Sequence, residues 1–329
     1  ISDFQFDNPY TGDGFEGDAT TNGASYQSRV KNYAVTFSNT AQYDWSLGNH
    51  QFSVLAGFET YSKKRERWGA ERTGLLDSAF SVYQADYYNT YPYSNYLAET
   101  TMMSYLGRLN YDYKSKYILS LNFRRDGFSA LSKNNRWGNF GGVSAAWRIS
   151  EEPFFEPLKN VFSDFKIKGS WGVVGNTNVD AYAAKSYYSS GFYGNSGAYY
   201  LSSIADSENL KWESSTKSDI GFSALLPGNV SIDFDYYYNK ASDMILNVPT
   251  AVSKGIPSNK ITTNAGKMSN SGIEFSVSAD VIHSKSFKWN TQFNIATQRN
   301  RVLALASGID YLLGGEEMNM TVVGKSIGQ

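Results

Sequence analysis

The chain has 329 residues, and its 30 Lys and Arg against 31 Asp and Glu leave a net charge of −1, without the positive excess that holds a nucleic-acid backbone. It has no cysteine, which excludes disulfides, thiolate metal sites and cysteine nucleophiles, and it has two histidines. The longest apolar run has five residues, 302–306, against the roughly 20 that a transmembrane helix needs.

The predicted elements are strands, because apolar and polar residues alternate along most of the chain with a period of two. The first strand covers 33–46, and Gly48-Asn49 can supply the positive φ of a tight turn into a second strand at 51–59. The same alternation predicts eight further strands, at 102–113, 117–124, 143–150, 164–174, 217–226, 230–239, 273–280 and 287–295.

The strands and their connections have the proportions of a membrane barrel. Many strands have ten or more residues, which suits a bilayer crossing better than the soluble norm of about 5–6. Short connections at 48–49, 114–116, 227–229 and 283–286, and an intermediate one at 151–163, alternate with long ones at 62–100, 125–136, 175–210, 240–269 and from about 304 onward. This plan predicts an all-β, antiparallel transmembrane β-barrel with short periplasmic turns and long extracellular loops. A soluble β-sandwich or solenoid would explain the alternation equally well and stays open as the alternative.

Within a barrel, the alternation assigns each side chain to lipid or to the lumen. The residues expected to face lipid are Tyr43, Trp45, Tyr117, Leu119, Leu121 and Phe123, and those expected to face the lumen beside them are Asp44, Ser120 and Arg124. The candidate lumen-facing polar residues of the whole wall are Arg108, Arg124, Asp219, Asp233 and Asp235.

Short motifs of enzymes occur in the wrong context, so we predict no catalytic, cofactor or metal site. The GxGxxG pattern at 12–17 is followed by loop residues rather than a helix, and the acids Asp7, Asp13, Glu16 and Asp18 do not have EF-hand spacing. The GxSxG pattern at 324–328 is not followed by a histidine. Adjacent Glu151 and Glu152 would point to opposite faces of a strand, so a turn is the better interpretation.

Tyrosines crowd two of the long loops. A tyrosine ring offers apolar contact and a hydroxyl, which suits sugars and peptides. The candidate substrate-binding residues are Tyr87, Tyr88, Tyr91, Tyr93, Tyr193, Tyr199 and Tyr200. The alternative is that these rings pack the loops together or against a lid protein.

Several long segments carry a more specific pattern. Residues 104–155 read SYLGRLNYDYKSKYILSLNFRRDGFSALSKNNRWGNFGGVSAAWRISEEPFF, followed by WGVVGNTN (171–178), NLKWESSTKSDIGF (209–222), DYYYNKASDMIL (235–246), NAGKMSNSGIEF (264–275) and VVGKSIGQ (322–329). In order and spacing these segments resemble the barrel of the SusC/RagA family of TonB-dependent outer-membrane transporters. One departure is 127–131, where the family more often has a Ser/Arg-containing loop.

The resemblance implies a 22-stranded barrel, an N-terminal plug and a lid lipoprotein of the SusD type. This chain would then supply about ten strands: 1–28 as an extracellular loop segment, 29–303 as barrel strands with their turns and loops, and 304–329 as the start of a further extracellular loop. The plug region is absent from these residues.

The implied function is import of a large nutrient, an oligosaccharide or a peptide, across the bacterial outer membrane. The partners would be the SusD-like surface lipoprotein, the TonB complex acting through the plug region, the cargo and outer-membrane lipid, with no nucleic acid and no cofactor. The chain would be a multi-pass outer-membrane protein and not an enzyme. The alternatives are a passive porin and a soluble carbohydrate-binding β-domain.

Overall fold

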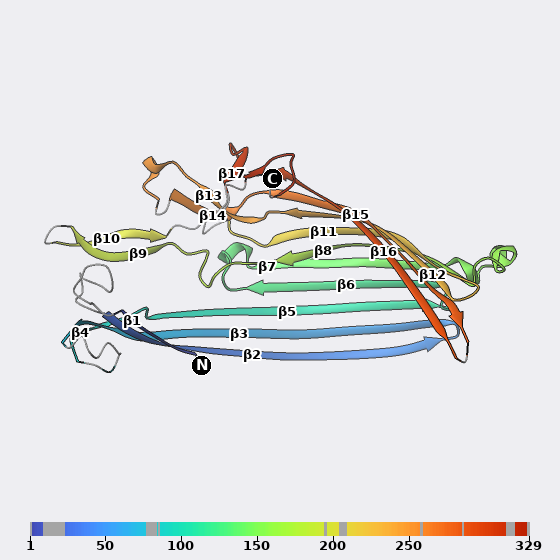
Figure 1. The fold of residues 1–329 in the computed structure, drawn as a ribbon, viewed down its shortest axis with the longest axis horizontal. Coiled ribbons are helices and arrows are strands. Elements are labelled where there is room, and N and C mark those ends of the chain that lie inside the picture. The colour runs from blue at the N-terminus through green and yellow to red at the C-terminus, as the bar shows by residue number, and fades with distance from the viewer. Residues whose placement is uncertain are drawn as a thin grey trace. The chain divides into compact units, whose positions relative to one another are not determined.

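Long antiparallel strands dominate the computed structural model, which describes residues 2–8, 24–76, 84, 86–193, 196–203, 209–256, 259–284, 286–313 and 320–327. One 12-stranded sheet has the order β1-β2-β3-β5-β6-β7-β8-β11-β12-β15-β16, with β4 paired to β3 (Figure 1). Its strands are β1 (Ser2–Asn8), β2 (Ala24–Leu47), β3 (His50–Leu75), β4 (Tyr87–Pro92), β5 (Tyr96–Tyr113), β6 (Tyr117–Phe128), β7 (Trp137–Arg148), β8 (Asp164–Asn176), β11 (Glu213–Leu226), β12 (Val230–Ser242), β15 (Lys267–His283) and β16 (Lys288–Ala304).

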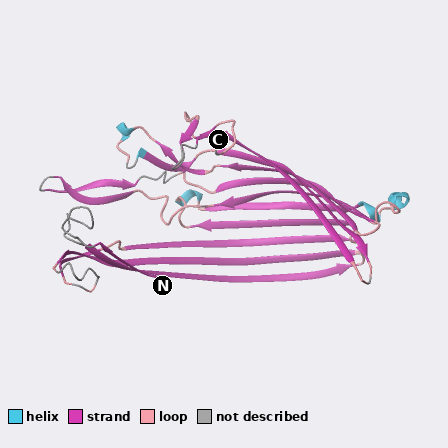
Figure 2. Ribbon diagram, viewed as in Figure 1, coloured by secondary structure: helices cyan, strands magenta, loops and turns pink. Residues whose placement is uncertain are grey.

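The connections carry small elements of their own. Three two-stranded sheets pair β9 (Tyr187–Tyr193) with β10 (Ser196–Ser203), β13 (Ile245–Pro249) with β14 (Lys260–Asn264), and β17 (Tyr311–Leu313) with β18 (Met320–Val322). The 3-10 helices are η1 (Lys133–Asn135), η2 (Ile149–Glu151), η3 (Pro153–Leu158) and η4 (Val252–Lys254). Figure 2 shows these helical turns in the connections between strands. Among the residues described, no helix has the length and apolar character needed to cross a membrane.

The ten strands expected from alternation are all present, as β2, β3, β5, β6, β7, β8, β11, β12, β15 and β16. The tight turns also form where the sequence placed them. Gly48 takes a φ of +59° between β2 and β3, and Gly228 and Asn229 take +86° and +60° between β11 and β12. The β5–β6 turn is less obvious from sequence, because Lys114 and Ser115 both adopt positive φ, a conformation that usually favours Gly or Asn.

The long loop expected at 62–100 is much shorter in the structure, and this part of the sequence interpretation was wrong. β3 continues to Leu75 and β5 begins at Tyr96, so much of 62–100 is strand. Alternation stops near Lys63 because charged residues then occupy both faces, yet the ladder of backbone hydrogen bonds continues beyond it. The stretches 1–28 and 304–329, expected as loop, also contain the strand β1 and the β17–β18 pair.

The chain divides into two compact units, Ile1–Phe37 with Thr60–Met102, and Ser38–Glu59 with Met103–Gln329. In the first unit, β1 pairs with the beginning of β2, and β4 pairs with the end of β3. In the second unit, the turns and the β7–β8 connection lie at one end of the strands, which we call the turn end. The β9–β10 and β13–β14 hairpins lie at the opposite, loop end (Figure 1).

Few side chains of the long strands are buried, and the core lies instead at the roots of the loops. Leu131 and Leu210, 1% and 0% exposed, pack with Ala184 into one small cluster. By contrast, large apolar side chains of the strands such as Ile220 and Phe293 are 60% and 58% exposed. A soluble sandwich would bury such a face, so this one needs a nonaqueous neighbour.

Candidate functional site

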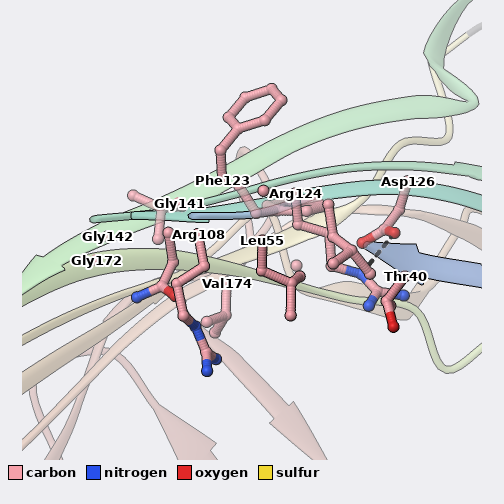
Figure 3. A pocket seen from close by; sticks show the side chains of 16 residues that line it. Thr40, Leu55, Arg108, Phe123, Arg124, Asp126, Gly141, Gly142, Gly172 and Val174 are labelled. Atoms are coloured by element: carbon pink, nitrogen blue, oxygen red, sulfur yellow. Dashed lines mark hydrogen bonds and ion pairs between the residues drawn. The ribbon is translucent and has the colours of Figure 1, made fainter. Parts of the chain in front are cut away.

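The register of the second unit separates the strands into an apolar face and a polar face. Leu121 lies opposite Val143, and Val143 lies opposite Trp171, so these apolar residues share one face. Figure 3 shows the Phe123 ring on the opposite side of the sheet from the Arg108 side chain. The expected alternation of β6 is therefore present, and successive residues of β6, β7 and β8 project alternately to two chemically distinct faces.

The apolar face has an aromatic row at the turn end. Ring centroids lie 4.9 Å apart for Trp45 and Phe52, 5.1 Å for Phe52 and Tyr111, and 6.4 Å for Tyr117 and Trp147. Because the residues come from five strands, β2, β3, β5, β6 and β7, the row is a property of the wall rather than of one hairpin.

A second aromatic row crosses the apolar face near the loop end. Tyr105 lies 5.4 Å from Phe58 and 6.1 Å from Trp137, and the Arg125 guanidinium lies 5.3 Å from the Trp137 ring. Trp137 and Trp147 are ten residues apart on β7, which is about 33 Å along the strand and about 25 Å in height at a tilt of ~40°. That height equals the apolar band of an outer-membrane barrel, with an aromatic girdle at each edge.

The polar face carries an arginine-centred recess of about 650 Å³ (Figure 3). Arg124 Nε lies 2.7 Å from Asp126 Oδ1, and Arg124 Nη2 lies 3.3 Å from Glu59 Oε1 and donates to Ser104 Oγ at 2.9 Å. Arg108 Nε donates to Asn122 Oδ1 at 2.8 Å. These contacts join β3, β5 and β6 and hold charged groups of both signs on the inner surface of the recess.

A second cluster of polar side chains lies on the neighbouring strands β8, β11, β12 and β15. Cross-strand pairing puts Lys168, Gly221, Asp235 and Glu274 in one row, and Lys168 Nζ lies 2.8 Å from the Asp235 carboxylate. In the rows beside it, Asp219 lies between Ser170 and Tyr237, and Asp233 accepts a hydrogen bond from Ser223 Oγ at 2.6 Å.

Glycines keep parts of this polar face open. A Cβ at Gly221 would overlap the Asp235 carboxylate, so the missing side chain is what lets Lys168 reach Asp235 across the intervening strand. Gly142 and Gly172 are cross-strand partners in the floor of the recess, where a Cβ on either would fall 3.0–3.2 Å from backbone atoms of the other strand. The wall there is backbone with hydroxyls, amides and paired charges around it.

This polar face offers several separate hydrogen-bonding and charged groups. In the part of the chain that the structure describes, no three His, Asp or Glu side chains gather closely enough to hold a metal ion. The GxGxxG pattern at 12–17 and the acids Asp13, Glu16 and Asp18 lie outside the described residues.

The tyrosines of the first unit that were expected in a loop lie on β4 or, for Tyr93, directly after it, and they divide into packed and exposed rings. Tyr93 stacks on Tyr26 with ring centroids 4.5 Å apart and lies 5.7 Å from the Arg67 guanidinium, and Tyr87 lies 5.0 Å from that of Arg72. Tyr88 and Tyr91 are exposed, the former by 77%. In the second unit Tyr199 is 83% exposed, while the side chains of Tyr193 and Tyr200 lie outside the described residues.

The platform beneath the loops was not expected from sequence. Its core of Leu131, Ala184 and Leu210 comes from three separate connections, and Trp212 packs against it while its Nε1 donates to Arg136 O at 2.8 Å. No periodic pattern marks these residues, because each connection contributes only one or two of them. Isolated leucines and a tryptophan inside polar loops are the only signal.

Comparisons with known proteins agree with this geometry. Residues 2–325 match the family model described as TonB dependent receptor-like, beta-barrel. The chain is 31% identical to the TonB-dependent receptor SusC of Bacteroides thetaiotaomicron, over 97% of this chain and 31% of that protein. It is 32% identical to the TonB-dependent receptor P3 of Formosa agariphila, over 84% of this chain and 28% of that protein.

Among solved structures, that of the RagAB peptide transporter superimposes with a TM-score of 0.81 at 22% identity, over 92% of this chain and 34% of that one. The outer membrane transporter YddB from Escherichia coli gives 0.56 at 14% identity, over 93% of this chain and 38% of that one. The chain therefore spans about a third of the length of the proteins that it matches.

Proposed function

Because the chain belongs to the TonB-dependent receptor-like β-barrel family, a family of outer-membrane transporters rather than enzymes, we propose that it forms part of the wall of an importer for large nutrients. The observation that carries the proposal is the contrast between the two faces of the sheet. One face has an apolar band about 25 Å high between two aromatic rows, and the other holds ion pairs and hydroxyls along the same strands.

The polar face is proposed to line the passage. Arg124 and Lys168 each have a carboxylate within 2.8 Å, so neither presents a bare charge that would trap a cargo of opposite sign. Burying these ions against hydrocarbon would cost several kcal/mol each, about 2–4 kcal/mol for an Arg or Lys at the midplane. Weak contacts with many hydroxyls and amides suit an oligosaccharide or a peptide that must enter and also leave.

The exposed loop tyrosines are proposed to meet the cargo or a lid. Tyr88 and Tyr91 are 77% and 50% exposed, whereas Tyr87 and Tyr93 lie against neighbouring arginines. The relative from Bacteroides thetaiotaomicron is named SusC, and the RagAB neighbour is described as a peptide transporter. By analogy we propose a SusD-like surface lipoprotein as lid, the TonB complex as the source of energy, and a glycan or peptide as cargo.

The test compares uptake of a fluorescent oligosaccharide and a fluorescent peptide by cells that contain the complete protein, with and without TonB. We expect the cells to take up one of the two cargo classes. This uptake should be lost without TonB and reduced in the double variant Tyr88→Ala with Tyr91→Ala. Tyr93→Phe is the matched control, because it keeps the stacked ring and should leave uptake unchanged. Uptake that persists without TonB would contradict the importer and favour a passive porin. Recovery of the protein from cells without detergent would favour a soluble carbohydrate-binding domain.

A further inference from the structure

One connection at the turn end is unlike its neighbours. The other turns there have two to four residues, whereas the β7–β8 connection runs from Ile149 through η2 and η3 to Ser163. It exposes the apolar side chains of Phe154, Leu158 and Val161 by 64%, 47% and 50%, beside an ion pair between Glu156 and Lys159. Three large exposed apolar side chains within eight residues of a connection need a partner other than water.

The connection is anchored on the apolar side of the sheet by its phenylalanines. Phe155 is 5% exposed and stacks on Phe165, with ring centroids 6.1 Å apart, and Phe162 lies 5.5 Å from the same Phe165 ring. Phe165 is paired with Ala224 and contacts Phe222 at 5.7 Å, both on the apolar face of β11. The connection therefore folds against the surface that faces lipid in the proposed importer.

Contacts with the aromatic row set the height of the connection. Phe154 lies edge-on to Trp147, with ring centroids 6.3 Å apart, and Trp147 belongs to the row at the turn end. Aromatic rows of barrels lie at the level of the lipid headgroups. In the proposed importer, this contact puts Phe154 at the level of the turn-end aromatic row.

The carboxylate of Glu152 lies at this level and accepts hydrogen bonds from three neighbouring side chains. Glu152 accepts from the Tyr117 hydroxyl, from Trp147 Nε1 at 3.0 Å and from Lys116 Nζ at 3.1 Å, and its side chain is only 11% exposed. The Tyr117 hydroxyl, followed by the Trp147 indole, holds the pKa of Glu152 below its usual range. The polar atoms of two girdle rings are thereby satisfied within the protein, and the exposed apolar side chains of the connection lie beside them.

We infer that Phe154, Leu158 and Val161 insert into the boundary between headgroups and acyl chains of the periplasmic leaflet, so that the β7–β8 connection is a phospholipid-binding anchor. The inference rests on the proposed function, because only a membrane barrel puts lipid against this face. Phe154 joins this surface to the lipid-facing girdle through its contact with Trp147, and Lys159, which is 48% exposed and paired with Glu156 at 2.7 Å, lies beside it.

The test uses the complete protein in vesicles of phosphatidylethanolamine and phosphatidylglycerol. The 329 residues contain no cysteine, so Phe154→Cys, Leu158→Cys and Val161→Cys each introduce one site in this chain for an environment-sensitive fluorophore. Fluorescence is compared in plain lipid, in lipid brominated near the carbonyl end of the acyl chains, and in lipid brominated near the methyl end. Iodide in the aqueous phase reports exposure to water. Leu121→Cys in the middle of the apolar band is the deep control, and Asn49→Cys in the β2–β3 turn is the aqueous control.

We expect labels at 154, 158 and 161 to lose fluorescence with shallow bromines, to lose less with deep bromines, and to resist iodide more than the label at 49. The label at 121 should be quenched most by deep bromines. Quenching at 121 combined with free access of iodide at 154, 158 and 161 would overturn the anchor while leaving the importer intact. Protection of these three sites from both quenchers would also overturn it, because a protein surface would then cover them. Absence of bromine quenching at 121 would instead count against the membrane barrel itself.

Discussion

A single arginine placed in the apolar band should destabilise the barrel strongly. Leu121 lies four residues from Tyr117 in the turn-end row, which is about 13 Å along β6 and about 10 Å in height at a tilt of ~40°. Gly127, the cross-strand partner of Trp137 in the loop-end row, is six residues beyond it, or about 15 Å higher. Leu121 is therefore close to the midplane, where an arginine costs about 2–4 kcal/mol. The folding equilibrium should shift by roughly 30- to 900-fold.

The assay is a guanidinium titration of the complete protein in phospholipid vesicles, followed by the loss of heat-resistant migration on gels. Ser120→Arg is the matched control, because it adds the same charge to the adjacent residue on the polar face. It removes one hydrogen bond, from Ser120 Oγ to Asn110 Oδ1 at 2.7 Å, so a loss of about 1 kcal/mol is expected. If Leu121→Arg unfolded at the wild-type guanidinium concentration, or if Ser120→Arg were the more damaging change, the assignment of the two faces would be refuted.

Three further measurements address the polar face, the turn end and the topology. Gly221→Ala should cost about 1–3 kcal/mol in the same titration, because its Cβ would displace the Asp235 carboxylate from its ion pair. Folding lowers the pKa of Glu152 from 4.5, so the ionised carboxylate stabilises the fold fully above pH 4.5. This contribution should decline as the pH falls through the pKa of the folded state, and Glu152→Gln should make the decline smaller. Protease added to intact cells should cleave within 175–210 and spare the turn at 227–229, and the reverse pattern would invert the proposed orientation.

The long strands and the chemistry of their faces were predictable because both are local. In β6, residues Tyr117 to Phe123 alternate in sequence, and a strand projects successive side chains to opposite faces whatever lies beside it. The turn at Gly228 was equally visible, because a positive φ limits the residue types that can occupy it. By register the polar residues Arg108, Arg124, Asp219, Asp233 and Asp235 share one face, and their exposure to a lumen stays a prediction.

Strand ends were predicted less well. Residues beyond Lys63 in β3 lack alternation because both sides of the strand are polar there, and backbone pairing alone extends it to Leu75. The loop-root core around Leu131 and Leu210 also left no periodic trace, since its members come from connections far apart in the chain. The exposure of each tyrosine could not be predicted either, because Tyr93 is partly covered by Tyr26 and Arg67, which lie far from it in the sequence.

The sequence by itself determined that this protein is a set of long amphipathic strands with an apolar and a polar surface, since a period of two depends only on the extended backbone. The tertiary structure decided which residues meet across strands. Lys168 reaches Asp235 only because the register puts Gly221 between them, and Phe155 finds Phe165 only because the β7–β8 connection folds back onto the apolar face. Contacts between strands depend on register and on the space left by glycine, and neither can be read from the alternation of a single strand.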